Sequence, residues 1–339
     1  MSLVNSVLKG DRLALSRVLS QIENDTQVGQ LALRELFAHS GKAQLIGVTG
    51  APGTGKSSLV NQLAYHYRHP PKKLAAKKVA IIAVDPSSPF TGGAVLGDRI
   101  RMQSLSGDTG VFIRSMASRG SLGGLANTTA GLVQAFDAAG FDVIMIETVG
   151  AGQAEVDIAR LAHTTLVVEA PGLGDDIQAI KAGILEIADI LVVNKADRPG
   201  VENTERALRN MLKLGHPVQR IFQHHGQTET STVSVSTMDD GPMWIPPVLR
   251  TIATDSSGVP ELIEAIANHR AYLEKTGDLQ RRERARLESE LDYRLQDNLV
   301  SRWRESLSEE AYEKVLKQLL ARSISPQEAV QSLLNGAQK

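Results

Sequence analysis

The chain has 339 residues, of which 42% are hydrophobic and 22% are charged, and its 37 basic side chains nearly balance its 38 acidic ones. A chain of this length and composition can bury a substantial core, which excludes general disorder. Cysteine is absent, which excludes disulfide scaffolds, thiolate metal sites and cysteine nucleophiles. The balanced charge argues against a broadly basic surface, so we predict no nucleic-acid partner.

No apolar run approaches the roughly 18–20 residues that a membrane helix needs. The N-terminal segment mixes charged and apolar residues, without the apolar stretch of a signal peptide. We therefore expect a cytoplasmic protein with no membrane partner.

Apolar residues at helical spacing predict two amphipathic helices before residue 42. The first is marked by Val4, Leu8, Leu13, Leu15 and Leu19, and the second by Leu31, Leu33, Leu36 and Phe37. Short apolar runs then alternate with helical stretches, as in a βαβ series. Runs without polar alternation are typical of parallel strands that are buried on both faces.

The predicted strands are residues 45–48, 79–84, 111–113, 143–146, 166–168 and 190–193, with a last strand at 244–252. The predicted helices between them are residues 57–67, 120–138, 153–162, 175–187 and 203–214. Residues 224–241 are rich in Thr, Ser and Gln and indicate a loop or an exposed hairpin. From residue 259 onward the pattern is almost wholly helical.

The first predicted strand runs directly into the sequence GAPGTGKS, which fits the phosphate-binding pattern G-x-x-x-x-G-K-[ST]. Glycines let backbone N–H groups curl around phosphate oxygens, and the following helix adds the positive end of its dipole. Lys56 is expected to bridge the β- and γ-phosphates as a catalytic residue, and the Ser57 hydroxyl to bind Mg²⁺. The nucleotide-binding residues predicted here are Gly50, Ala51, Pro52, Gly53, Thr54, Gly55, Lys56, Ser57 and Ser58.

A base-selecting motif, Asn194-Lys195-Ala196-Asp197, follows the strand predicted at 190–193. The Asp197 carboxylate can accept two hydrogen bonds from the N–H edge of guanine, whereas adenine would present an acceptor to it. Ligands of open α/β sheets bind at the carboxyl ends of strands, where this motif lies. The sequence therefore favours GTP and GDP over ATP. Residues 251–254, with Ala253 and Thr254 at their end, are predicted to supply a backbone contact to the guanine oxygen.

Three acids are candidates for Mg²⁺ or its bound water, together with Ser57: Asp85, Asp98 and Glu147. Each one taken singly could instead be a strand-end turn or a helix cap. Glu147 and Gly150 stand where many GTPases have D-x-x-G, and the Gly150 N–H can approach a γ-phosphate. We assign catalytic roles to Glu147 and Gly150 as well as to Lys56. Because Ala151 occupies the place of the usual water-orienting glutamine, we predict slow intrinsic hydrolysis that a partner accelerates.

Long strings between these motifs carry a resemblance: VDPSSPFTGGAVLGDRIRM, ETVGAGQAEVD, PGLGDDIQAIKAG and NKAD, in this order after the phosphate loop. They resemble the MeaB/ArgK/MMAA GTPases, which are GTP-dependent chaperones of cobalamin-dependent acyl-CoA mutases such as methylmalonyl-CoA mutase. The resemblance implies three switch segments, at residues 85–102, 147–157 and 171–183, and a homodimer joined by its C-terminal helices. The switch or partner residues are then Gln153, Asp175, Gln178 and Lys181.

The predicted fold is α/β, a mostly parallel central sheet of the P-loop GTPase type with helical extensions at both ends. The expected domains are an N-terminal helical extension (1–42), a GTPase domain (43–257) and a C-terminal helical dimerisation arm (258–339). Two alternatives stay open: a small-molecule kinase that uses the same phosphate loop, and a metallochaperone GTPase. The second is weakened because metal delivery favours thiolates and the only adjacent histidines are His224 and His225.

Overall fold

A computed structural model describes residues 2–71, 73–86, 105, 107–118, 124–148, 160–172, 187–214 and 243–336. These residues form two compact units, Met1–Glu283 and Arg284–Lys339. The described helices of the first unit are α1 (Leu3–Leu8), α2 (Arg12–Glu23), α3 (Gln27–Leu36), the 3₁₀ turn η1 (Phe37–His39), α4 (Lys56–Arg68), α6 (Gly124–Ala138), α9 (Val201–Leu214) and α10 (Val259–Thr276). Helix α11 (Asp278–Ser306) continues into the second unit, which also holds α12 (Glu309–Leu320) and α13 (Pro326–Gly336).

The sheet of the first unit has seven strands, all parallel, in the order β3-β2-β4-β1-β5-β6-β7. Its strands are β1 (Gln44–Thr49), β2 (Val79–Pro86), β3 (Val111–Ser118), β4 (Val143–Thr148), β5 (Thr164–Glu169), β6 (Ile190–Asn194) and β7 (Val248–Thr251). Strand β1 lies between β4 and β5, so the chain builds β2 to β4 on one side of it and β5 to β7 on the other. The predicted α/β fold with a parallel sheet is confirmed.

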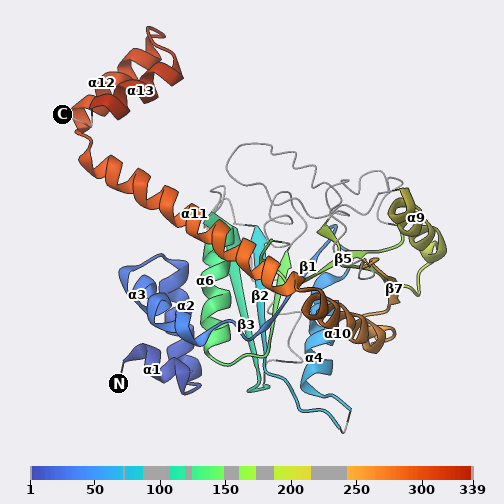
Figure 1. Cartoon of the computed structure of the whole chain (residues 1–339). Helices are drawn as coiled ribbons and strands as arrows, with labels where there is room; N and C mark the ends of the chain where they lie inside the picture. The colour runs from blue at the N-terminus through green and yellow to red at the C-terminus, as the bar shows by residue number, and fades with distance from the viewer. Residues whose placement is uncertain are drawn as a thin grey trace. The chain divides into compact units, whose positions relative to one another are not determined.

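Helices cover both faces of the sheet because neighbouring residues of each strand point to opposite sides (Figure 1). On β4, Ile144 and Ile146 pack with α1, α2, α3 and α6, whereas Val143 and Met145 pack with α4 and α10. On β6, Leu191 and Val193 pack under α9. Burial on both faces explains why the inner strands β1, β2, β4, β5 and β6 appear in the sequence as largely continuous apolar runs.

The N-terminal region departs from the prediction of two helices, because the first is divided into α1 and α2. Gly10 has a φ of 85°, which ends α1, and the Asp11 side chain then caps α2 by accepting from the N–H groups of Leu13 and Ala14. Leu13 lies on the outer side of α2, with 61% of its surface exposed, whereas Leu15 and Leu19 are buried. Helix spacing alone concealed the break, because Leu8 and Leu15 are seven residues apart and fit one continuous pattern.

The last strand is also shorter than predicted, since β7 begins at Val248 and not at Trp244. Two consecutive prolines, Pro246 and Pro247, precede it, and neither has an N–H to donate to a ladder. The predicted helices at 153–162 and 175–187 and the loop at 224–241 lie largely or wholly outside the described residues. None of the described helices carries an apolar stretch that could cross a bilayer.

Candidate functional site

The phosphate loop joins the end of β1 to the start of α4, at the centre of the sheet. Gly50, Gly53 and Gly55 all have positive φ, at 138°, 81° and 91°. A Cβ on Gly50 would lie 2.0 Å from the carbonyl oxygen of Val168 in β5, so only glycine permits this approach. The loop therefore curls tightly against the neighbouring strand.

Lys56 is the first residue of α4, and it is buried, with only 6% of its surface exposed. Its Nζ donates to the carbonyl oxygens of Gly50 at 2.8 Å and Ala51 at 2.9 Å, which places the positive charge inside the curl of the loop. Helix α4 has no side-chain cap at Gly55. Backbone N–H groups at a helix start, the helix dipole and a lysine ammonium together favour an anion such as phosphate.

Ser57 and Glu147 meet beside the loop, although they are 90 residues apart in the chain. The Ser57 Oγ donates to Glu147 Oε1 at 2.6 Å, and both residues are buried. The register of the sheet explains the meeting, because Glu147 in β4 pairs with Val48 in β1 and Ala83 in β2. A hydroxyl and a carboxylate are hard oxygen ligands, and Mg²⁺ at a phosphate site commonly takes only one or two protein ligands. The two residues therefore fit Mg²⁺.

The other two predicted metal ligands are less fully described. Asp85 is the penultimate residue of β2, so its backbone ends near the same sheet edge as Glu147, but its side chain is outside what the structure describes. Asp98 lies outside the described residues. Within the described ranges, no group of three or more His, Asp or Glu side chains is arranged to hold a metal.

Asn194, at the end of β6, ties the base-selecting motif to the phosphate loop. Its Nδ2 donates to the carbonyl oxygen of Thr54 at 2.8 Å, and its Oδ1 accepts from Thr251 Oγ1 at 3.1 Å and from the Ala253 N–H at 3.2 Å. Asn194 is 1% exposed, so it joins three segments from inside the protein. A Cβ on Gly55 would lie 2.5 Å from Asn194 Nδ2, which gives a second reason for glycine in the loop.

Lys195 and Asp197 complete the motif at the surface. Lys195 has a φ of 57°, and its Nζ donates to the carbonyl oxygen of Gly53 at 2.6 Å. The Ala196 N–H donates to the carbonyl oxygen of Thr251, which holds the turn against the end of β7. Asp197 is exposed and can receive a ligand from solvent. The Asp197 carboxylate, the Lys195 side chain and the phosphate loop thus lie together at the carboxyl ends of the strands.

The structure brings most of the predicted nucleotide residues together, from Gly50 through Ser58 and from Asn194 to Asp197, with Ala253 and Thr254 beside them. The predicted residues Gly150, Gln153, Asp175, Gln178 and Lys181 lie outside the described residues, as do His224 and His225. Sequence reasoning missed two residues next to the site, Gln62 and Ser256, whose side chains are hydrogen-bonded to each other. No motif marks them, because their contact spans 194 residues.

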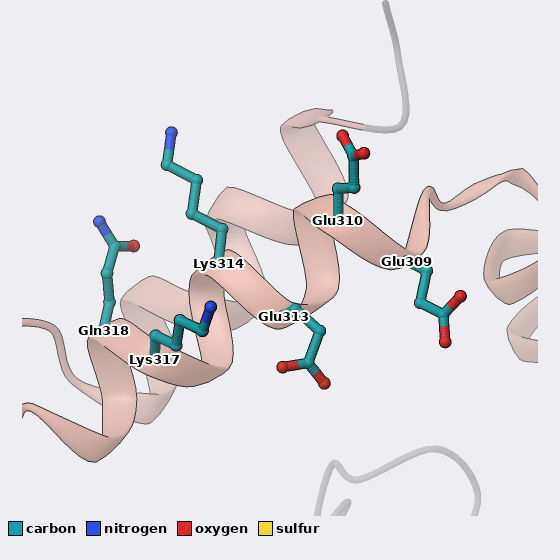
Figure 2. Close-up of a pocket in the computed structure, with 6 residues that line it drawn as sticks. All are labelled: Glu309, Glu310, Glu313, Lys314, Lys317 and Gln318. Atoms are coloured by element: carbon teal, nitrogen blue, oxygen red, sulfur yellow. The ribbon is translucent and has the colours of Figure 1, made fainter.

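A separate hollow lies on α12 in the second unit (Figure 2). All the residues that line it come from this one helix: Glu309, Glu310, Glu313, Lys314, Lys317 and Gln318. The close-up shows these side chains spreading outward and not converging on a point. A surface of this kind has the mixed charges of a solvated helix and does not form a ligand site.

The parallel sheet, the phosphate loop at the end of β1 and the lysine inside its curl define a P-loop nucleotide-binding protein. Residues 14–308 match the family described as "Methylmalonyl Co-A mutase-associated GTPase MeaB". The chain therefore belongs to the MeaB family, and it is a GTPase.

Individual proteins that are similar to this chain are also described as GTPases. A protein of Pyrococcus abyssi, described as a candidate GTPase, is 41% identical over 98% of this chain and 95% of its own length. The GTPase ArgK of Escherichia coli is 32% identical over 82% of this chain and 78% of its own. A crystal structure titled as an LAO/AO transport system kinase covers 99% of this chain and 97% of its own, with a TM-score of 0.68 and 23% identity. That structural likeness supports the fold alone.

Proposed function

We propose that this GTPase is a Mg²⁺-dependent switch that serves a cobalamin-dependent acyl-CoA mutase of the methylmalonyl-CoA mutase type. The observation that carries the switch is the convergence of Lys56, the Ser57–Glu147 pair and Asn194 at one edge of the sheet. In this proposal GTP lies across that edge, with its phosphates on the loop and its base on the β6 turn. The site residues are those predicted from the sequence.

The chemistry is positioning and charge stabilisation of the γ-phosphoryl group. The Lys56 ammonium would turn from the loop carbonyls to the β- and γ-phosphates, and the N–H groups at the start of α4 would donate to phosphate oxygens. Ser57 and Glu147 would hold Mg²⁺, which neutralises charge on the phosphates when it is bound. Gly150, Asp85 and Asp98 are proposed to complete this arrangement. Loss of the γ-phosphate removes their contacts, which makes hydrolysis a conformational signal.

The mutase partner is supported by the family description, which names association with methylmalonyl-CoA mutase. The GTPase would control cofactor loading, or protect or reactivate the mutase, with Gln153, Asp175, Gln178 and Lys181 reporting the nucleotide state. The test is a nucleotide-dependent pull-down against candidate cobalamin mutases, with the GTPase rate measured with and without each. We expect slow hydrolysis alone and a faster rate with the cognate mutase. If no cobalamin mutase changes the GTPase rate, the chaperone role is refuted, whereas the assignment as a GTPase is unaffected.

A homodimer is also proposed, and the surface of α11 supports it. Leucines recur every fourth residue at Leu287, Leu291, Leu295 and Leu299, and each is 39% or more exposed. Residues four apart share one side of a helix, so a second copy could bury this apolar row. Replacing Leu291 and Leu295 by lysine should convert a dimer to a monomer in light scattering, and a wild-type monomer would refute the proposal. A cytoplasmic location stays a prediction.

A further inference from the structure

The loop after β7, residues 252–258, has a tightly fixed shape. Ile252 and Ser257 form an antiparallel bridge, in which the Ile252 N–H donates to the Ser257 carbonyl oxygen at 2.9 Å. Gly258 has a φ of 74°, and a Cβ there would lie 2.0 Å from the carbonyl oxygen of Arg250. The chain therefore folds back closely before it enters α10 (Figure 1). The exposed tip of this loop includes Thr254 and Asp255.

Two side chains from other elements hold this loop, one on each side of its tip. Asn194 of β6 accepts the Ala253 N–H at 3.2 Å. Gln62 of α4 accepts from the Ser256 Oγ at 2.8 Å, through its Oε1. Ser256 has a φ of 67°, a left-handed conformation that is uncommon for serine and is maintained only when its surroundings fix it.

The Gln62 contact joins the base side of the site to the helix of the phosphate loop. Helix α4 begins at Lys56, so Gln62 lies on the same rigid element that carries the phosphate-binding lysine and Ser57. Gln62 is half-buried, which limits competition by water for its hydrogen bond. A backbone N–H of the loop after β7 that is fixed before the ligand arrives loses less entropy on binding than an N–H on a free loop.

We propose that Gln62 is a positioning residue for guanine recognition. Through Ser256 it holds the loop so that the backbone N–H of Thr254, the residue after the Ala253 N–H that Asn194 accepts, donates to the O6 atom of guanine. This inference rests on the proposed nucleotide site and adds a determinant of its specificity. Gln62 does not contact the base itself. It affects only the hydrogen bond between the loop and guanine O6. The amino edge of guanine is recognised by Asp197, on a different turn.

Two nucleotide analogues separate the two contacts. Replacing O6 by sulfur in 6-thio-GDP weakens the acceptor that the loop N–H meets, whereas IDP keeps O6 and lacks the amino group that donates to Asp197. The affinities of GDP, 6-thio-GDP and IDP are measured by calorimetry on the full chain. We expect Gln62→Ala and Ser256→Ala each to reduce the preference for GDP over 6-thio-GDP about three- to tenfold, the range of one neutral hydrogen bond. The preference for GDP over IDP should not change.

Two further variants separate positioning from folding. Ser257→Ala is the matched control, because its exposed side chain lies one residue from Ser256, and it should keep all wild-type ratios. Ser256→Gly removes the hydroxyl and also relieves the positive φ, so it should keep or raise thermal stability and still lose the 6-thio-GDP discrimination.

The outcomes are distinguishable. If Gln62→Ala and Ser256→Ala keep the wild-type preference for GDP over 6-thio-GDP, the inference is wrong. An equal fall in the preference over IDP would also overturn it, since the contact would then support the whole site and not the O6 contact. A wild-type protein that binds IDP as tightly as GDP would instead refute the proposed base site, and the inference with it.

Discussion

Replacing Asn194 by alanine is the most direct test of how the site is assembled. The substitution removes hydrogen bonds to the Thr54 carbonyl oxygen, the Thr251 hydroxyl and the Ala253 N–H, all in a place that is 1% exposed. Each neutral hydrogen bond contributes about 1 kcal/mol, so the loss should be about 3 kcal/mol of unfolding free energy. That is a large part of the roughly 5–15 kcal/mol that stabilises a typical protein.

The assay is urea denaturation of the nucleotide-free chain, with amide hydrogen exchange followed at Ala253. Exchange there should accelerate, because its N–H loses the Asn194 acceptor. GTP affinity should fall, because the phosphate loop and the loop after β7 are no longer joined through Asn194. Asn203→Ala is the matched control, since Asn203 is an exposed residue of α9. A destabilisation by Asn194→Ala below about 1 kcal/mol would show that the three bonds are replaceable and would refute the reasoning.

Three further variants test the phosphate loop, the Ser57–Glu147 pair and the pH dependence of stability. Gly55→Ala should abolish nucleotide binding, because its φ is 91° and the new Cβ would lie 2.5 Å from an amide nitrogen; binding is measured by fluorescence of a labelled GDP. Glu147→Gln should raise the Mg²⁺ concentration for half-maximal GTPase activity about 10- to 100-fold, measured in a Mg²⁺ titration. The hydrogen bond from Arg68 holds the pKa of Asp108 below its ordinary value, so this pair stabilises the fold above about pH 4 and the effect is lost as pH falls through the lower folded pKa. Asp108→Asn should therefore be less stable than wild type at pH 7, and in denaturation series the difference should shrink under acid.

Each of these has an outcome that contradicts it. Gly41 has a φ of 92°, and a Cβ at that position would have no atom within 4 Å, so Gly41→Ala carries the same backbone strain without the clash. If Gly55→Ala and Gly41→Ala bind labelled GDP equally well, the clash between a Cβ at residue 55 and Asn194 does not control nucleotide binding, and the prediction is wrong. An unchanged Mg²⁺ titration would exclude Glu147 from the metal site. A stability difference for Asp108→Asn that is constant between about pH 7 and about pH 3 would show that the Arg68 pair does not carry the effect.

Much of the fold follows from local sequence. The apolar runs predicted the five inner strands, because strands buried on both faces cannot carry alternating polar residues, and they marked the edge strands β3 and β7 with different bounds. The phosphate loop and the Asn194 motif could also be predicted from the sequence, since each is a short run of neighbouring residues whose backbone must take one conformation. The break at Gly10 leaves no signal in the apolar spacing, which continues through it. The start of β7 at Val248 depends on the missing N–H groups of the two preceding prolines, which a pattern of apolar residues does not register.

Only the tertiary structure decided which distant residues meet. The order of the strands brings Ser57 to Glu147 and Asn194 to Thr54, and it sets Ser256 against Gln62. These contacts depend on sheet register and helix packing, which no short stretch of sequence specifies. Length, charge balance and the absence of cysteine bounded the class of protein. The contact between α4 and the loop after β7 came from the packed structure, because a hydrogen bond across 194 residues has no local signature.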